Sequence, residues 1–135
     1  MCIFCKILNK EIPSTQVYED DLFVVIMDIF PISRGHMLIV PKEHCENIFD
    51  LPEHIAKNIY PLAKKLSICV SKALGTDGIN ILQNNGEIAG QEVFHFHLHI
   101  IPRYKDEDIQ ISKPTRLKLE ASEIEEIAQK IKNVI

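Results

Sequence analysis

Residues 95–101, with the sequence HFHLHII, constrain this chain more than any other segment. Histidine alternates there with large apolar residues, and successive side chains of a β-strand point to opposite faces of a sheet. The alternation therefore predicts a strand that places Phe96, Leu98 and Ile100 against a hydrophobic core. The three histidines then share the opposite face, spaced by roughly 7 Å along the strand.

Three histidines on one face indicate chemistry. A single histidine on a sheet is usually a hydrogen-bonded structural residue, but three in strict alternation are difficult to explain in that way. A neutral imidazole is suited to nucleophilic attack, proton transfer and metal binding near neutral pH. The backbones of His95 and His99 lie about 13 Å apart in a strand, whereas ligand atoms must come within ~2 Å of a metal. At least one of the three is therefore expected to be free of metal and available as a nucleophile or general base.

Length and charge limit the classes of partner. A chain of 135 residues is expected to form one domain, residues 1–135, that buries about two thirds of its surface. The net charge of −4 provides no broad basic face, so a nucleic-acid polymer is a poor partner. A small phosphorylated ligand fits, because histidines and backbone N–H groups can hold one phosphate without a basic patch.

The N-terminus has no basic segment followed by an apolar stretch of signal-peptide length. The longest apolar run, residues 22–27, is too short to span a bilayer. We therefore expect a cytoplasmic protein with no membrane partner. In that compartment its four cysteines are expected to be thiols or metal ligands rather than disulfides; they are Cys2, Cys5, Cys45 and Cys69.

Five strands are expected in a largely antiparallel sheet, because most connections are too short for a parallel crossover. The predicted strands are residues 16–19, 22–27, 37–40, 79–83 and 93–102, with a short helix over residues 2–9. The order indicates an α+β fold with helices on one face and the histidines on the open face.

Two longer helices complete the prediction. Asp50 and Glu53 resemble a capping box, behind which apolar residues recur at helical spacing as far as Ala73, with Cys69 or Val70 on the buried stripe. Pro61 is expected to kink or split this helix. A last helix opens at Ser122 and is expected to bury one apolar stripe, made of Ile124, Ile127, Ala128 and Ile131.

Residues 95–101 resemble the defining motif of the histidine-triad (HIT) family of nucleotide hydrolases and transferases. The similarity extends to short segments along most of the chain: Cys2-Ile3-Phe4-Cys5-Lys6-Ile7, Glu11-Ile12-Pro13, Asp28, Gly35-His36, Val40-Pro41-Lys42, Asn84-Asn85-Gly86, Gly90-Gln91 and Ile101-Pro102-Arg103. The resemblance implies a HIT-like fold, a homodimer, and attack on the α-phosphate of a purine nucleotide derivative. Nucleoside phosphoramidates and aminoacyl adenylates are the implied substrates.

The resemblance also assigns roles to the histidines. His97 would be the nucleophile and form a covalent nucleotidyl-histidine that water hydrolyses. Its other ring nitrogen is expected to donate to a backbone carbonyl, which would fix the tautomer. His99 would hold the phosphate oxygens and His36 would be a further donor.

A nucleotide-contacting set is implied in the same way. It comprises Asp28, Asn84, Gly90, Gln91, Glu92 and Val93. Asp28 would accept hydrogen bonds from the ribose, Asn84 would contact phosphate or ribose, and the backbone at Gly90 would approach the phosphate. Asp28 and Asn84 are also ordinary turn-forming residues at these positions.

Glu92 departs from the family pattern, which commonly places Ser or Thr there in relatives that hydrolyse phosphoramidates. A carboxylate at this position would repel a polyanionic leaving group. The nucleophile is unaffected, but the leaving-group preference is expected to differ.

Cys2 and Cys5 form a C-x-x-C pair with three interpretations: a structural zinc site completed by two histidines, free thiols, or a redox pair. The redox interpretation lacks the βαβ context that it requires. The resemblance implies structural zinc as the cofactor, with His44 and His95 as the other two ligands, which leaves His97 and His99 for phosphate.

Other functions remain compatible with the sequence. The chain could hydrolyse dinucleoside polyphosphates, bind purine nucleotides with little turnover, or use the triad on a catalytic zinc ion.

Overall fold

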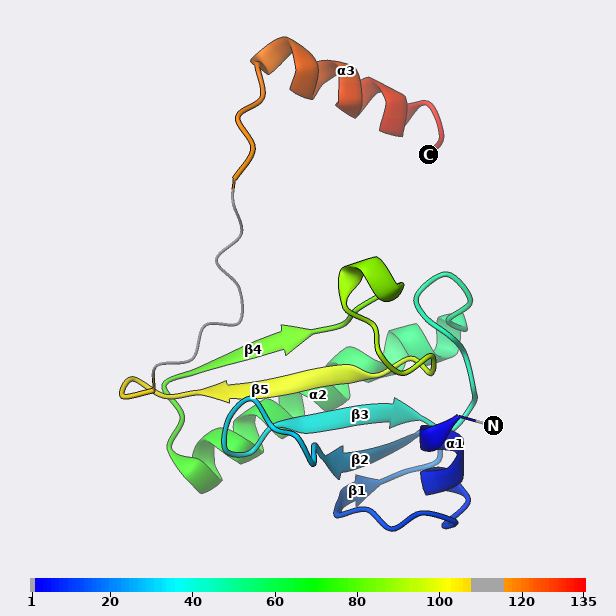
Figure 1. Cartoon of the computed structure of the whole chain (residues 1–135), viewed down its shortest axis with the longest axis vertical. Helices are drawn as coiled ribbons and strands as arrows, with labels where there is room; N and C mark the ends of the chain where they lie inside the picture. The colour runs from blue at the N-terminus through cyan, green and yellow to red at the C-terminus, as the bar shows by residue number, and fades with distance from the viewer. Residues whose placement is uncertain (1, 108–115) are drawn as a thin grey trace.

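The computed structural model describes residues 2–107 and 116–135. Its centre is one antiparallel sheet of five strands, as the sequence predicted, and the strands lie in the order β1-β2-β3-β5-β4 (Figure 1). The strands are β1 (Gln16–Glu19), β2 (Phe23–Met27), β3 (Met37–Pro41), β4 (Gly78–Leu82) and β5 (Leu98–Arg103). The helices are α1 (Ile3–Leu8), α2 (Glu53–Leu74), α3 (Ala121–Lys132) and the single 3₁₀ turn η1 (Glu87–Ala89).

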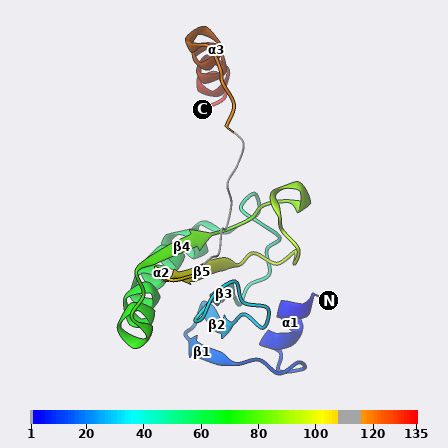
Figure 2. The same cartoon turned by 60° about the vertical axis from the view of Figure 1, so that its left-hand side comes forward.

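The two faces of the sheet carry separate hydrophobic clusters. Val25, Ile39 and Ile100, all fully buried, face α2, and for Ile100 the alternating pattern predicted this. The intervening residues of β2 and β3 face the other way and pack with Phe4 of α1. Figure 2 shows α1 and α2 on opposite sides of the sheet. The principal helix therefore covers one face, while α1 covers part of the histidine face that was expected to be open.

Helix α2 begins later than predicted. Its N-cap is Pro52, which makes no side-chain capping bond. The carboxylate of Asp50 instead accepts the backbone N–H groups of Glu46 and Asn47, both at 2.9 Å. Since those amides occupy the Asp50 oxygens, the carboxylate stabilises the preceding turn and not the helix.

The interior of α2 also corrects two expectations. The helix is 22 residues long and is not interrupted at Pro61. Buried apolar residues on both sides of the proline, such as Ile59 and Leu62, anchor it to the sheet. Cys69 is exposed, and Val70 continues the buried stripe.

Strand β5 is shorter than predicted, because the ladder with β3 stops at Leu98. Pro41 has no N–H to give, and its carbonyl accepts a 2.8 Å hydrogen bond from Nε2 of His95. The N–H of Phe96 donates to the carbonyl of Cys45 at 2.7 Å. The segment before β5 is thus tied to side chains and loops, yet it keeps the alternation, with Phe96 buried in the α2 cluster.

Helix α3 differs most from expectation. Its apolar stripe, predicted to be buried, is about half exposed, with Ile124 at 54%, Ile127 at 46% and Ile131 at 56%. The helix is well formed, and its capping box pairs Glu120 with Glu123. Figures 1 and 2 both show it set apart from the sheet. The burial prediction failed because no described element of the same chain covers the stripe.

No helix in the described ranges combines the length and the apolar character that crossing a membrane requires.

Candidate active site and metal centre

His97 is held with one ring nitrogen free. Its Nδ1 lies 2.7 Å from the backbone carbonyl of His95, which can only accept, so Nδ1 carries the proton. Nε2 then has an available lone pair. The predicted contact with a backbone carbonyl is therefore present, and it leaves His97 in the tautomer that a nucleophile needs.

His99 is held in the opposite tautomer through His36. Nδ1 of His36 accepts the N–H of Ile32 at 3.1 Å, so the proton of neutral His36 is on Nε2. That Nε2 donates to Nδ1 of His99 at 3.0 Å and lies 3.5 Å from a carboxylate oxygen of Asp28. His99 consequently carries its proton on Nε2, as a donor toward the open side of the ring.

Burial keeps these rings neutral. Burial is the largest cause that lowers the pKa of His36, and the Asp28 carboxylate only partly offsets it. Burial, followed by His97 and His36, lowers the pKa of His99 to about 4. Burial likewise lowers the pKa of His97, against the opposing hydrogen bond to His95. At neutral pH the set therefore presents a lone pair on His97 beside an N–H donor on His99.

The loop before β3 places His36. Gly35 has φ +88°, and a Cβ there would lie 2.7 Å from Leu74 of α2, so only glycine fits this close approach. The hydroxyl of buried Ser33 donates to the carbonyl of Pro102 in β5. The loop is thereby fastened to both α2 and β5, which fixes the imidazole of His36 behind His99.

A second cluster joins Cys2, Cys5, His44 and His95. The six separations among the two sulfur atoms and the two Nδ1 atoms run from 3.0 Å to 3.8 Å. Tetrahedral zinc with bonds of about 2.0–2.3 Å would space the same atoms at roughly 3.3–3.8 Å. The donor set and its dimensions therefore fit one zinc ion.

The surroundings of this cluster prepare its donors for a metal. The bond from Nε2 of His95 to the Pro41 carbonyl leaves Nδ1 of His95 with a lone pair toward the cysteines. Cys2 caps α1, and its sulfur accepts the N–H of Cys5 at 3.2 Å. Burial and the adjacent Cys2 raise the pKa of Cys5, whose ionised form needs a positive partner.

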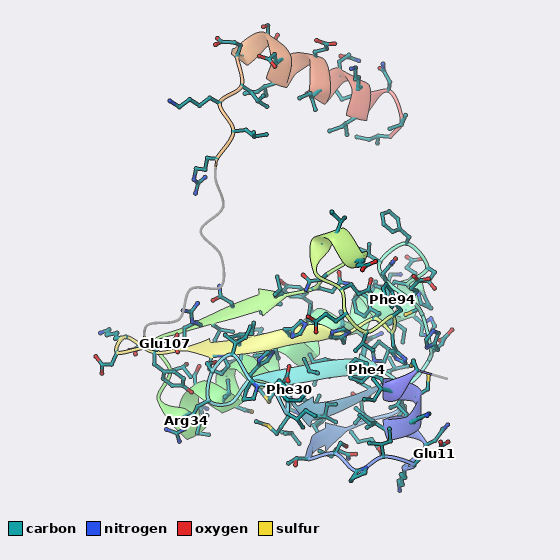
Figure 3. All side chains as sticks on the ribbon, viewed as in Figure 1. Phe4, Glu11, Phe30, Arg34, Phe94 and Glu107 are labelled. Atoms are coloured by element: carbon teal, nitrogen blue, oxygen red, sulfur yellow. The ribbon has the colours of Figure 1, made fainter. Side chains whose placement is uncertain are left out.

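Phe4 connects the two clusters, and sequence reasoning assigned it no role. Its ring meets the edges or faces of His95 and His97 at centroid separations of 5.9 Å and 5.0 Å. Figure 3 labels it where α1 meets the sheet. Its position between Cys2 and Cys5 was the available signal, since a metal that joins those cysteines to His95 brings Phe4 against the triad.

The predicted nucleotide-contacting residues divide into two groups. Asp28 lies beside His36, and one of its oxygens also accepts the N–H of Phe30 at 2.8 Å. Asn84 donates to the carbonyl of Gly90 at 3.2 Å, which joins it to the turn before the triad. Gly90 has φ +92° and its N–H is bonded to Glu87.

Gln91 is buried and braces this turn from inside. Its side chain accepts the N–H of Gly86 and donates to the carbonyls of Glu46 and Val93, and its own N–H is bonded to Gly86. Glu92 is exposed, whereas Val93 packs against the cluster around Phe4.

Comparison with known proteins gives one consistent result. The profile of the HIT domain matches residues 9–106. An adenosine 5'-monophosphoramidase of Schizosaccharomyces pombe is 45% identical over 106 residues, which are 78% of this chain and 77% of that protein.

Solved structures agree. A crystal structure of a HIT family protein from Bacillus anthracis matches with a TM-score of 0.89 and 39% identity, covering 99% of this chain and 96% of the other. A zinc-bound histidine triad family protein from Mycobacterium smegmatis matches with a TM-score of 0.78 and 34% identity, covering 85% and 84%.

Proposed function

The chain belongs to the HIT family, and we propose that it is a nucleotidyl hydrolase or transferase acting on the α-phosphate of purine nucleotide derivatives. The monophosphoramidase of S. pombe supports nucleoside phosphoramidates as substrates, and aminoacyl adenylates present the same phosphorus with another leaving group. The observation that carries the proposal is the free Nε2 of His97, fixed by the bond of Nδ1 to the His95 carbonyl.

The reaction has two displacements. Nε2 of His97 attacks the α-phosphorus, a P–N bond forms, and the leaving group departs with the electron pair of its bond to phosphorus and takes a proton from water. The substituted ring is a cation, because Nδ1 keeps its proton on the His95 carbonyl. In the second step water forms a P–O bond and loses a proton, and the P–N electrons return to His97. A transferase would accept another nucleophile in place of water.

The remaining residues orient the nucleotide. Nε2–H of His99 donates to a phosphate oxygen, which stabilises charge in the transition state. His36 acts through His99 by fixing its tautomer. Asp28 binds the ribose, and the turn from Asn84 to Val93 lies along the phosphate.

An apolar rim beside Asp28 suits a purine base. The loop after β2 leaves Ile29 and Phe30 at 76% and 85% exposure (Figure 3 labels Phe30). Aromatic and aliphatic side chains provide the stacking surface that a planar base requires. A base on this rim would keep the ribose within reach of Asp28.

The decisive test is His97→Ala. We expect turnover of a nucleoside phosphoramidate to fall by several orders of magnitude while binding of the nucleoside monophosphate changes little, because His99 and His36 remain. His54→Ala is the matched control, since His54 is an exposed histidine on α2 whose ion-pair partner is Glu43. Rapid denaturation of the wild type during turnover is expected to trap one nucleotidyl group on His97, detected by peptide mass spectrometry.

Turnover of His97→Ala within tenfold of the wild type would contradict the nucleophile assignment. Tight nucleotide binding by the wild type without turnover would instead favour a nucleotide-binding module. A catalytic zinc held by Asp28, His36 and His99 is disfavoured by the tautomer of His36, because its protonated Nε2 cannot be a ligand while Ile32 donates to Nδ1.

We further propose that Cys2, Cys5, His44 and His95 hold one structural zinc ion. The donor spacing and the lone pair on His95 support this proposal, as does the zinc-bound relative from M. smegmatis. Zinc in a closed four-ligand site contributes to folding and not to the reaction. The site would hold α1 and Phe4 against the triad.

At the level of the whole chain we propose a single domain, residues 1–135, that acts as a homodimer. Apolar side chains that the single chain leaves partly exposed, such as Ile68 on α2 and Ile127 on α3, support association with a second copy.

A further inference from the structure

Nucleotidylation of His97 creates a positive charge in a place with little water. Nε2 supplies the electron pair of the new P–N bond while Nδ1 keeps its proton on the His95 carbonyl, so the ring becomes a cation. His97 is half-buried, and its neighbour Phe4 is 6% exposed. Burial disfavours a charge unless nearby groups compensate for the lost water. The rate of this step therefore depends on what surrounds the His97 ring.

The polar surroundings of His97 compensate only in part. Among the described residues, the hydrogen-bond partner of its ring is the His95 carbonyl, which accepts Nδ1–H at 2.7 Å. The ring of His99 lies 4.9 Å from that of His97 between centroids, but it presents an N–H donor rather than a negative group. The Asp28 carboxylate lies at the other end of the set, where it approaches Nε2 of His36 and accepts the N–H of Phe30.

The ring of Phe4 is the other close neighbour of His97. The two centroids are 5.0 Å apart and the ring planes meet at 78°. A nearly perpendicular pair places the edge of one ring against the face of the other. The face of an aromatic ring is negative and attracts a cation within about 6 Å of its centroid. With the edge of His97 on the face of Phe4, the pair has the geometry that stabilises a charged imidazole.

Phe4 is held firmly in this position (Figure 3). It is the buried residue of α1 and lies between Cys2 and Cys5 of the proposed metal site. Its ring also meets that of His95 at 82°, with centroids 5.9 Å apart. It packs in an apolar cluster of β2 and β3, made of Val24, Ile26, Leu38 and Val40. Such surroundings exclude water and strengthen the attraction between a cation and a ring face.

We propose that Phe4 is a catalytic residue whose face receives the edge of the His97 ring and stabilises the positive charge acquired during nucleotidylation. This inference rests on the nucleophilic role proposed above for His97. The charge is absent while a nucleotide is merely bound, so Phe4 stabilises the transition state and the covalent intermediate and not the bound ground state. Its contribution is expected in the rate of nucleotidylation and not in nucleotide affinity.

Graded fluorination of the Phe4 ring tests the proposal. Full-length proteins expressed with zinc carry mono-, di- or trifluorophenylalanine in place of Phe4 alone, which removes negative charge from the face while the ring stays nearly the same size. Rapid mixing with a nucleoside phosphoramidate gives the rate at which nucleotidyl-His97 forms. We expect this rate to fall with each added fluorine, by about tenfold over the series. Binding of the nucleoside monophosphate and the Tm are expected to stay unchanged.

Phe23 provides the matched control. It is 1% exposed and packs in the α2 cluster, on the other face of the sheet from Phe4. The same fluorinated residues in place of Phe23 are expected to leave the rate unchanged. Phe4→Leu keeps an apolar side chain but removes the ring face. It is expected to slow nucleotidylation at least as much as trifluorination, while binding of the monophosphate changes little.

The other outcomes overturn the proposal. A rate that is the same for every fluorinated ring would show that Phe4 acts through its shape alone. A rate that rises with fluorination would show that Phe4 presents its edge, and not its face, to His97. In both cases nucleotidyl-His97 still forms in the wild type, so the proposed function stands. A wild type that forms no nucleotidyl-His97 would overturn the proposed role of His97 and this inference with it.

Discussion

At the scale of single residues, the histidines differ because the second nitrogen of each ring has a different partner. Nε2–H of His95 donates a hydrogen bond to the Pro41 carbonyl, Nδ1–H of His97 donates one to the His95 carbonyl, and Nδ1 of His99 accepts one from His36. One ring is left as a metal ligand, the next as a nucleophile and the third as a donor. The alternation in the sequence places the rings on one face, but it contains no information on Pro41 and His36, which come from distant segments.

The neutral rings predict a dependence of stability on pH. The pKa of His99 is lowered to about 4, mainly by burial, whereas a histidine in the unfolded chain has a pKa of about 6.5. Above pH 6.5 both states are neutral there, and the stability is fully present. As the pH falls toward 4, only the unfolded state binds the proton, so stability is lost. We expect the Tm to drop between pH 7 and pH 5.

His99→Gln tests the origin of this drop. Glutamine cannot titrate, so the Tm of the variant is expected to fall less than that of the wild type between pH 7 and pH 5. Other buried histidines, such as His36, still contribute to the fall in Tm. Calorimetry of both proteins at each pH gives the comparison. Identical pH profiles would show that His99 does not carry the effect.

Glu92 predicts the leaving-group preference. Its carboxylate is exposed one residue after Gln91, in the turn that leads to the triad. If the Glu92 carboxylate and a phosphate of the leaving group are ~6 Å apart in an effective dielectric of about 20, they repel each other. The repulsion is on the order of 2–3 kcal/mol per charge pair before screening by salt. We expect the wild type to prefer phosphoramidates or aminoacyl adenylates over diadenosine tetraphosphate.

Glu92→Ser is expected to narrow that preference, mainly by improving the polyphosphate. The measurement is kcat/KM for both substrate classes in both proteins, with Glu87→Ser, in the adjoining turn η1, as the control. A wild type that already favours the polyphosphate, or a ratio that Glu92→Ser leaves unchanged, would remove this role from Glu92.

At the scale of elements, periodicity predicted which segments are strands and helices better than where they end. All five strands and both long helices exist, because buried alternation and helical spacing are properties of the local sequence. The ends were misplaced for two reasons. Asp50 has a competing local use, because its carboxylate caps the turn before it instead of α2. The end of β5 is decided by the bond from His95 to Pro41, two residues that only the fold brings together.

The short helix α1 predicts the effect of metal removal. Only one of its six residues, Phe4, is buried, so the cysteines at its start and the proposed zinc are its main attachment to the sheet. Cys5→Ser is expected to abolish stoichiometric zinc and to lower the Tm, because a structural metal contributes directly to folding. Cys69→Ser, which alters an exposed thiol outside the cluster, is the matched control.

Elemental analysis and thermal melts of the three proteins provide the readout. The wild type and Cys69→Ser are expected to contain about one zinc per chain. A wild type expressed with zinc available but purified without stoichiometric metal would contradict the site. Retention of zinc by Cys5→Ser would remove Cys5 from the ligand set.

At the scale of the whole molecule, the sequence identified the apolar stripe of α3 but not what covers it. A stripe of isoleucines predicts that the stripe is buried. It does not indicate whether the surface that buries it belongs to the same chain or to another copy. Only the arrangement in space shows that no described residues of the chain cover the stripe, and that the edge of β4 is open as well. The prediction of burial was therefore wrong for the described residues of the single chain.

The proposed homodimer predicts that thermal stability depends on protein concentration. Unfolding then releases two chains, so mass action favours the folded dimer as concentration rises. A tenfold increase is worth about 1.4 kcal/mol of dimer, which corresponds to a rise in Tm of roughly 2–6 °C for a chain of this size. Ile68→Glu places a charge on the apolar surface between α2 and β4 and is expected to melt at a Tm that does not vary with concentration. Scanning calorimetry over a hundredfold range of concentration measures both proteins, with exposed Ile29→Glu as the control for a charge outside that surface. A wild-type Tm that stays constant over that range would show that folding is complete within one chain and would contradict the homodimer.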